Sequence, residues 1–200
     1  MGAGTAVADE ASAPPALTVL GRSFAASELG NPAPNSDCRA LEPMAKAVMG
    51  PLFAVFTEQA GLAVSEDEIK DYCRRLLADA DEKTIAETWE QWKPKGTQWK
   101  ARQEAVMRLS VWKLQRSLYE KYGGRVVWGT GAPPQAFDGM AAYLAERETA
   151  GDFAIFDEQL RIRFWECLRA PKGPVFSARQ GRVLIEEHPA ERQLRRRVQP

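Results

Sequence analysis

The chain has few of the residues that most often carry catalysis or bind metal ions. It contains one histidine, His188, and three cysteines, Cys38, Cys73 and Cys167, no two of which form a CxxC pair. Zinc sites and thioredoxin-like redox sites need such clusters. His188 lies in a charged C-terminal stretch beside Pro189, where it is poorly placed to serve as a base. We therefore expect no catalytic residue, no cofactor and no metal, and an enzyme acting through carboxylates or Cys38 remains an alternative.

Long apolar runs and an excess of one charge are also missing. No run of apolar residues is long enough to span a bilayer, so we expect no membrane span. The 27 Lys and Arg residues balance the 27 Asp and Glu residues. No overall field therefore attracts the chain to nucleic acid, and we expect no nucleic-acid partner. The balance is uneven, because residues 169–200 hold eight basic and three acidic side chains.

The first residues, 1–16, are rich in Ala, Gly and Pro and lack both the basic start and the long apolar centre of a signal peptide. We predict a flexible leader, or what remains where a signal peptide was removed. In the second case the protein belongs in the periplasm or cell envelope, and otherwise in the cytoplasm.

Helical periodicity is what the chain does have. Apolar residues recur at three- and four-residue spacing over 41–60, which predicts a long helix that ends at Gly61 and bends at Pro51. Ser65 followed by Glu68 has the spacing of a capping box, which predicts the start of a second helix.

Further helices are expected at 81–93, 97–122, 134–149 and 157–168. We thus predict an all-α fold, an irregular bundle of five to six helices with one long central helix, and short extended segments at 17–20 and 125–128. The organisation predicted is a leader at 1–16, a helical domain at 17–170, and a basic, partly ordered tail at 171–200.

The cysteines fit this helical body. Cys73 and Cys167 lie in apolar helical stretches, where a free cysteine packs as a small hydrophobic residue. We expect both to be buried and free, and one disulfide is the alternative.

Aromatic residues and methionines are the candidates for a binding surface. Three tryptophans lie near one helix–helix corner, and methionines occur in the first long helix. Exposed side chains of these types bind apolar segments of other proteins. The candidate polypeptide-binding surface comprises Met44, Met49, Phe53, Trp89, Trp92 and Trp99. The alternative, which we favour for the tryptophans, is that they line the core.

Residues 17–78 resemble the N-terminal helical domain of the SurA and PpiC-type folding factors, which is similar to the C-terminal domain of trigger factor. The opening strand of that family has a V-x-G-x-x-I pattern, matched here from Val19 to Phe24. After a long helix comes A-x-x-x-G-l-x-v-s-x-x-E-I, matched here from Ala60 to Ile69. No parvulin isomerase domain follows in the sequence.

The resemblance implies a non-catalytic, chaperone-like protein that binds unfolded or extended polypeptide. It also implies that a later helix, for which 157–168 is the candidate, returns to pack on the first ones. The alternative is a structural or adaptor protein that binds one specific protein partner. The sequence does not indicate an oligomeric state.

Overall fold

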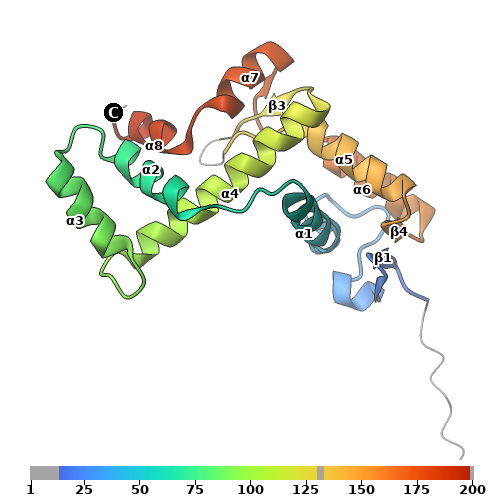
Figure 1. Cartoon of the computed structure of the whole chain (residues 1–200). Coiled ribbons are helices and arrows are strands. Elements are labelled where there is room, and N and C mark those ends of the chain that lie inside the picture. The colour runs from blue at the N-terminus through green and yellow to red at the C-terminus, as the bar shows by residue number, and fades with distance from the viewer. Residues whose placement is uncertain (1–13, 130–132, 199–200) are drawn as a thin grey trace, which may run out of the picture.

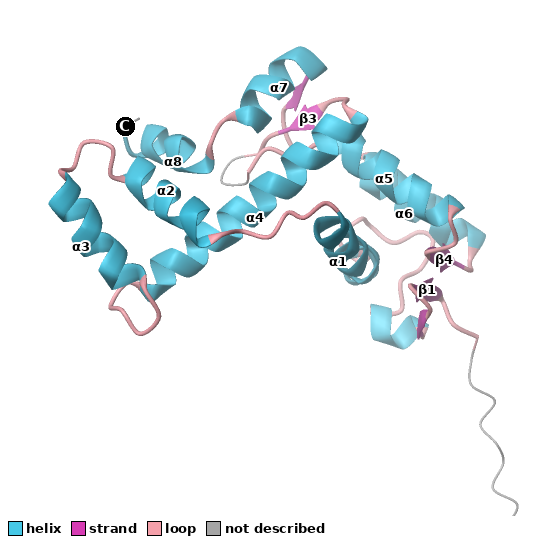
Figure 2. Ribbon diagram, viewed as in Figure 1, coloured by secondary structure: helices cyan, strands magenta, loops and turns pink. Residues whose placement is uncertain are grey.

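The computed structural model describes residues 14–129 and 133–198, and these are mostly helical. Eight α-helices and five short strands lie within this part of the chain (Figures 1 and 2). The all-α prediction therefore holds at the level of fold class. The helices outnumber the five to six predicted, and two small sheets accompany them. Most of the predicted leader, 1–16, lies outside the described residues.

The chain enters the fold as a β-hairpin. Strands β1 (Leu17–Val19) and β2 (Arg22–Phe24) are antiparallel, and the turn places Leu20 and Gly21 at positive φ. Strand β4 (Phe153–Ile155) pairs with the other side of β1, giving the order β2-β1-β4. The predicted extended segment at 17–20 is thus confirmed, but its pairing with β4 was not predicted.

Helix α1 (Glu42–Gln59) follows a short 3₁₀ turn at Ala26–Leu29 and contains Pro51. It ends as predicted at Gly61, whose φ of 63° suits glycine. The amide of Gly61 and the next amide both donate to carbonyls of the last helical turn.

Helix α2 (Glu66–Leu76) begins with the predicted capping box. The amide of Glu68 donates to the Ser65 hydroxyl at 3.2 Å, and the amide of Ser65 donates to the Glu68 carboxylate at 2.7 Å. Lys113 also donates to this carboxylate, at 2.8 Å, so the start of α2 is fixed against another helix.

The next four helices match the predicted ranges closely. They are α3 (Glu82–Trp92), α4 (Trp99–Tyr122), α5 (Phe137–Thr149) and α6 (Glu158–Arg169). Asp81 and Asp157 accept hydrogen bonds from the first-turn amides of α3 and α6, as their capping positions require. Strand β3 (Val126–Val127) lies within the extended segment predicted at 125–128.

The segment expected as a partly ordered tail, 171–200, forms regular structure up to residue 198. Strand β5 (Val175–Phe176) pairs with β3, and helices α7 (Ala178–Glu186) and α8 (Pro189–Val198) follow. Helix α8 packs on α2, and α7 packs on α4. Sequence composition indicated a solvated end, but Ile185 and Ala190 are buried against the body, while Val175 and Val183 stay exposed.

Side chains and carbonyls hold this segment in place. Ile185 is buried, and its carbonyl accepts a hydrogen bond from the Trp112 indole at 2.8 Å. Arg192 is also buried and donates to the carbonyls of Leu184 and Glu187. Its charge is balanced by the Glu187 carboxylate at 3.4 Å.

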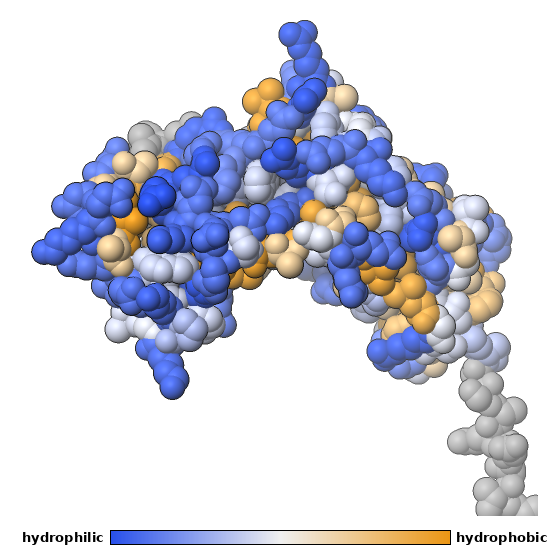
Figure 3. All heavy atoms as spheres, in the orientation of Figure 1, coloured by the Kyte–Doolittle hydropathy of each residue, from blue (hydrophilic) through white to orange (hydrophobic). Residues whose placement is uncertain are grey.

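The long helix α4 runs from the region of α2 and α3 to that of α5 (Figure 1). It joins two hydrophobic clusters. The larger cluster lies between α1, α5, α6 and the three-stranded sheet, and the C-terminal half of α4 reaches it through Leu118. The smaller cluster lies between α2, α3, α8 and the N-terminal half of α4, which contributes Ala105 and Leu109. The face seen in Figure 3 is mostly hydrophilic, and one of its apolar patches lies in the region of α1 and the adjoining strands.

Candidate functional site

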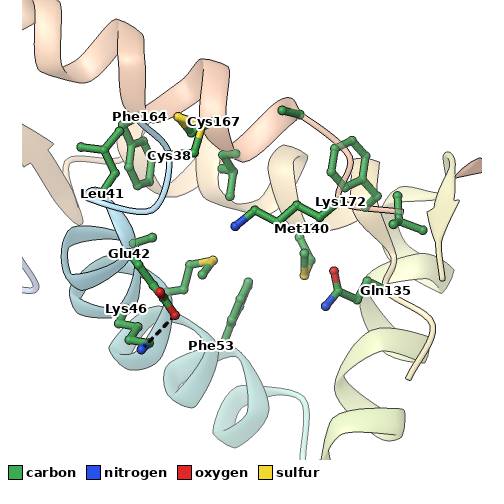
Figure 4. A pocket seen from close by; sticks show the side chains of 16 residues that line it. Cys38, Leu41, Glu42, Lys46, Phe53, Gln135, Met140, Phe164, Cys167 and Lys172 are labelled. Carbon is green, nitrogen blue, oxygen red and sulfur yellow. Dashed lines mark ion pairs between the residues drawn. A yellow bond between two sulfur atoms is a disulfide. The ribbon is translucent and has the colours of Figure 1, made fainter. Parts of the chain in front are cut away.

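A groove with a cavity volume of about 330 Å³ lies between α1, α5, α6 and strand β3 (Figure 4). Most of its lining is apolar. Met49 and Phe53 come from α1, Phe137 and Met140 from α5, and Phe164 and Leu168 from α6. A concave site of this size and character is typical of ligand pockets. We therefore treat the groove as the candidate functional site.

Helical spacing explains why α1 supplies one wall. Met44, Val48, Leu52 and Phe56 form its fully packed stripe against the larger cluster. Ala45, Met49 and Phe53 lie next to that stripe at four-residue spacing and are half-buried. A stripe of this width is broader than the core needs, so its edge is left to line the groove.

The opposite wall depends on a buried polar contact. Gln115 of α4 is buried and accepts a hydrogen bond from the Ala136 amide at 2.7 Å. Its side-chain amide also donates to the sulfur of Met140 at 3.4 Å. These bonds fix the start of α5, and with it the positions of Phe137 and Met140 in the groove.

A disulfide forms part of the wall. Cys38, which precedes α1, is bonded to Cys167 near the end of α6, with 5.3 Å between their Cα atoms. The prediction that Cys167 is free is therefore wrong, because the fold brings the segment before α1 against α6. Cys73 is free and buried as predicted, and burial raises the pKa of its thiol.

Charged side chains occur at the rim. Lys46 forms an ion pair with Glu42 at 3.0 Å. This hydrogen bond and the charge of Lys46 hold the pKa of the Glu42 carboxyl below its ordinary value. Lys172, which follows α6, reaches over the groove from the other side (Figure 4). The rim is thus polar and the interior apolar.

The structure divides the predicted polypeptide-binding surface. Met49 and Phe53 lie together in the groove. Met44 is 0% exposed and Trp92 is 3% exposed, so neither belongs to a surface. Both face a hydrophobic cluster because the helical period turns them inward.

Trp89 and Trp99 are half-buried, and they are far from the groove residues in the fold. Arg102 lies between their rings, at 5.6 and 5.4 Å from the two ring centroids. It also donates two hydrogen bonds to Glu66 at the start of α2. The tryptophan corner therefore joins α2, α3 and α4, in line with the core alternative.

The remaining chemistry-bearing groups do not meet at the groove. His188 lies between the rings of Tyr72 and Trp112, and burial lowers its pKa. In the described part of the chain, no three His, Cys, Asp or Glu residues gather where they could hold a metal ion. Across the same residues, no helix combines the length and apolar character needed to cross a membrane.

Sequence reasoning did not find Gln135, Phe137, Met140 or Lys172. These residues come from the segments around α5 and after α6, and only the fold brings them to α1. Comparison of the chain with protein-family models, curated proteins and solved structures finds no match.

Proposed function

We propose that this protein is a chaperone-like, non-catalytic polypeptide-binding protein that holds apolar segments of unfolded or extended chains in the groove. The observation that carries the proposal is an open, largely apolar groove lined by two methionines and three phenylalanines. Methionine side chains are flexible and adapt to different apolar partners. Burial of apolar surface contributes about 25 cal/mol per Å² before the costs of binding, so a small groove binds weakly.

The arrangement of the first and last elements supports the resemblance to the SurA-type helical domain. Strand β1 pairs with β4, and the disulfide joins the segment before α1 to α6. The disulfide thus ties α6 to the segment before α1, whereas among the α-helices α1 itself packs mainly on α5. The capping box at the start of α2 belongs to the same pattern.

The disulfide also supports a location in an oxidising compartment. Disulfides form and persist in the periplasm and outside cells, and they are rare where thiols are kept reduced. We therefore favour the periplasm or cell envelope for the Cys38–Cys167 bond.

The test is suppression of aggregation. Two unrelated model clients are unfolded by heat, and light scattering is followed while the protein is added in stoichiometric steps. We expect dose-dependent suppression with both clients. The variants Met49→Gln and Ala45→Gln, which make the groove polar or fill it, should lose most of this effect.

Met107→Gln is the matched control, because Met107 is 58% exposed on α4 and does not line the groove. It should suppress aggregation as well as the unchanged protein does. Far-UV circular dichroism checks that each variant is folded. Absence of suppression at several-fold excess of the unchanged protein contradicts the proposal. Tight capture of one folded partner would then favour the adaptor alternative.

A further inference from the structure

Lys172 carries a positive charge over the apolar groove, and the carboxylate on which this charge acts, Glu42, is already paired with Lys46. Among residues 14–129 and 133–198, its ammonium group has no ion-pair or hydrogen-bond partner. Lys46, the other lysine at the rim, already pairs with Glu42. Figure 4 shows the Lys172 side chain extending across the groove. A cation placed beside an apolar cavity favours an occupant that brings a negative charge to the same place.

Two other clefts of the described structure differ in this respect. In the cleft of about 240 Å³ between α1, α4 and α5, Glu146 lies 2.6 Å from Arg147 and 3.8 Å from Lys121. In the cleft beside α6, Arg161 pairs with Glu148 at 2.7 Å. Of these three clefts within the described residues, the groove alone combines mostly apolar walls with a lysine that forms no direct ion pair.

Gln135 adds a second polar group at the groove. Its backbone is fixed by two hydrogen bonds with Val127, of 2.8 and 3.0 Å. Its side-chain amide lines the groove and, within the described residues, has no hydrogen-bond partner (Figure 4). An amide both donates and accepts, which is what the backbone of an extended chain requires.

We infer that the groove selects extended segments in which an acidic side chain lies two residues from an apolar one. In an extended chain, residues i and i+2 point to the same side and lie about 6–7 Å apart. The apolar side chain then enters the cavity, the carboxylate pairs with Lys172, and Gln135 meets the backbone between them. This inference rests on the proposed function and specifies its preferred client.

The test uses three peptides with both ends blocked and one differing residue. Each contains Leu-Ser-X in a Ser- and Gly-rich background, where X is Asp, Asn or Lys. Binding is measured by calorimetry at low ionic strength. We expect the Asp peptide to bind about fivefold more tightly than the Asn peptide, the size expected of an exposed ion pair. The Lys peptide should bind most weakly.

Reversal of the charge is the decisive variant. Lys172→Glu should prefer the Lys peptide over the Asp peptide, and this exchange of preference separates a charge contact from a loss of fold. Lys70→Glu is the matched control, because Lys70 is exposed on α2 and does not line the groove. Its preference should remain that of the unchanged protein.

Three outcomes overturn the inference. Equal binding of the three peptides, lost in Met49→Gln, would leave the proposed function intact and remove only the acidic preference. Binding of none of them would contradict both. Decanoate binding more tightly than every peptide, and displacing them, would assign the groove to a small amphiphilic carboxylate instead.

Discussion

A single buried amide fixes the start of α5. The side-chain oxygen of Gln115 accepts a hydrogen bond from the Ala136 amide, with 2.7 Å between oxygen and nitrogen. Replacement by leucine keeps a similar size but leaves that amide unsatisfied. Gln115→Leu should therefore lower the free energy of unfolding by about 1–3 kcal/mol in urea denaturation.

The control for this prediction is Gln103→Leu, because Gln103 is exposed on the same helix. Its effect should stay within about 0.5 kcal/mol. Equal losses in the two variants would show that the hydrogen bond of Gln115 is not what stabilises this junction.

The only histidine gives the fold a dependence on pH. His188 is half-buried between Tyr72 and Trp112. Burial lowers its pKa below the ordinary value of 6.5, and the positive charge of Arg75 is the second cause that lowers it. Among the charged groups around it, Arg75 and Arg192 lower the pKa of His188, whereas Asp71 and Glu191 raise it.

The folded state binds the proton of His188 less well than the unfolded state does. The contribution of His188 to stability is therefore complete above pH 6.5 and is lost as the pH falls. The free energy of unfolding should therefore decrease between about pH 7 and pH 5. In His188→Gln the decrease over this window should be smaller. An unchanged slope in the variant would assign the effect to carboxylates.

At the scale of elements, Trp92 is the most buried residue of α3. The Trp92 ring is 3% exposed and lies 6.4 Å from the ring of Tyr72. Trp92→Ala should cost about 3–5 kcal/mol of stability, as large aromatic truncations in cores do. Trp89→Ala should cost less, since Trp89 is only half-buried. Urea denaturation compares the two, and equal losses would contradict this account of the corner.

Local signals predicted most helices, because several of them carry their own start or stop signal. Ser65 with Glu68, Asp157 and Gly61 act within one turn of their position, and the structure shows each of them doing so. Strand β4 was missed because three residues are too few to show the alternating hydrophobic pattern of a strand. It forms only where β1, from the other end of the chain, offers hydrogen bonds.

The C-terminal helices and the groove were missed for a related reason. Helix α8 is strongly polar, and what holds it is the contact of its few inward residues with distant ones, such as the hydrogen bond between Tyr72 and Gln193 at 2.6 Å. Met49 and Phe53 were found because an apolar stripe marks them. Lys172 was not found, because nothing in the sequence around an exposed lysine shows that the fold places it beside a cavity.

At the scale of the whole molecule, the Cys38–Cys167 bond closes a large loop. The two cysteines are 129 residues apart in sequence, so the bond encloses α1 to α6. Such a cross-link reduces the freedom of the unfolded chain and stabilises the fold by about 2–5 kcal/mol. Urea denaturation with and without a reducing agent should show a loss of this size. In the double variant Cys38→Ser, Cys167→Ser, the reducing agent should have no effect.

Cys73→Ser distinguishes the bonded cysteines from the free one. Cys73 is buried in the smaller cluster and takes no part in the disulfide. The variant should be less stable overall, yet its loss on reduction should equal that of the unchanged protein. In the unchanged protein, one thiol should react with a thiol reagent in the unfolded, unreduced chain and three after reduction, as the cysteine count requires. Three reactive thiols before reduction would contradict the pairing and remove the argument for an oxidising compartment.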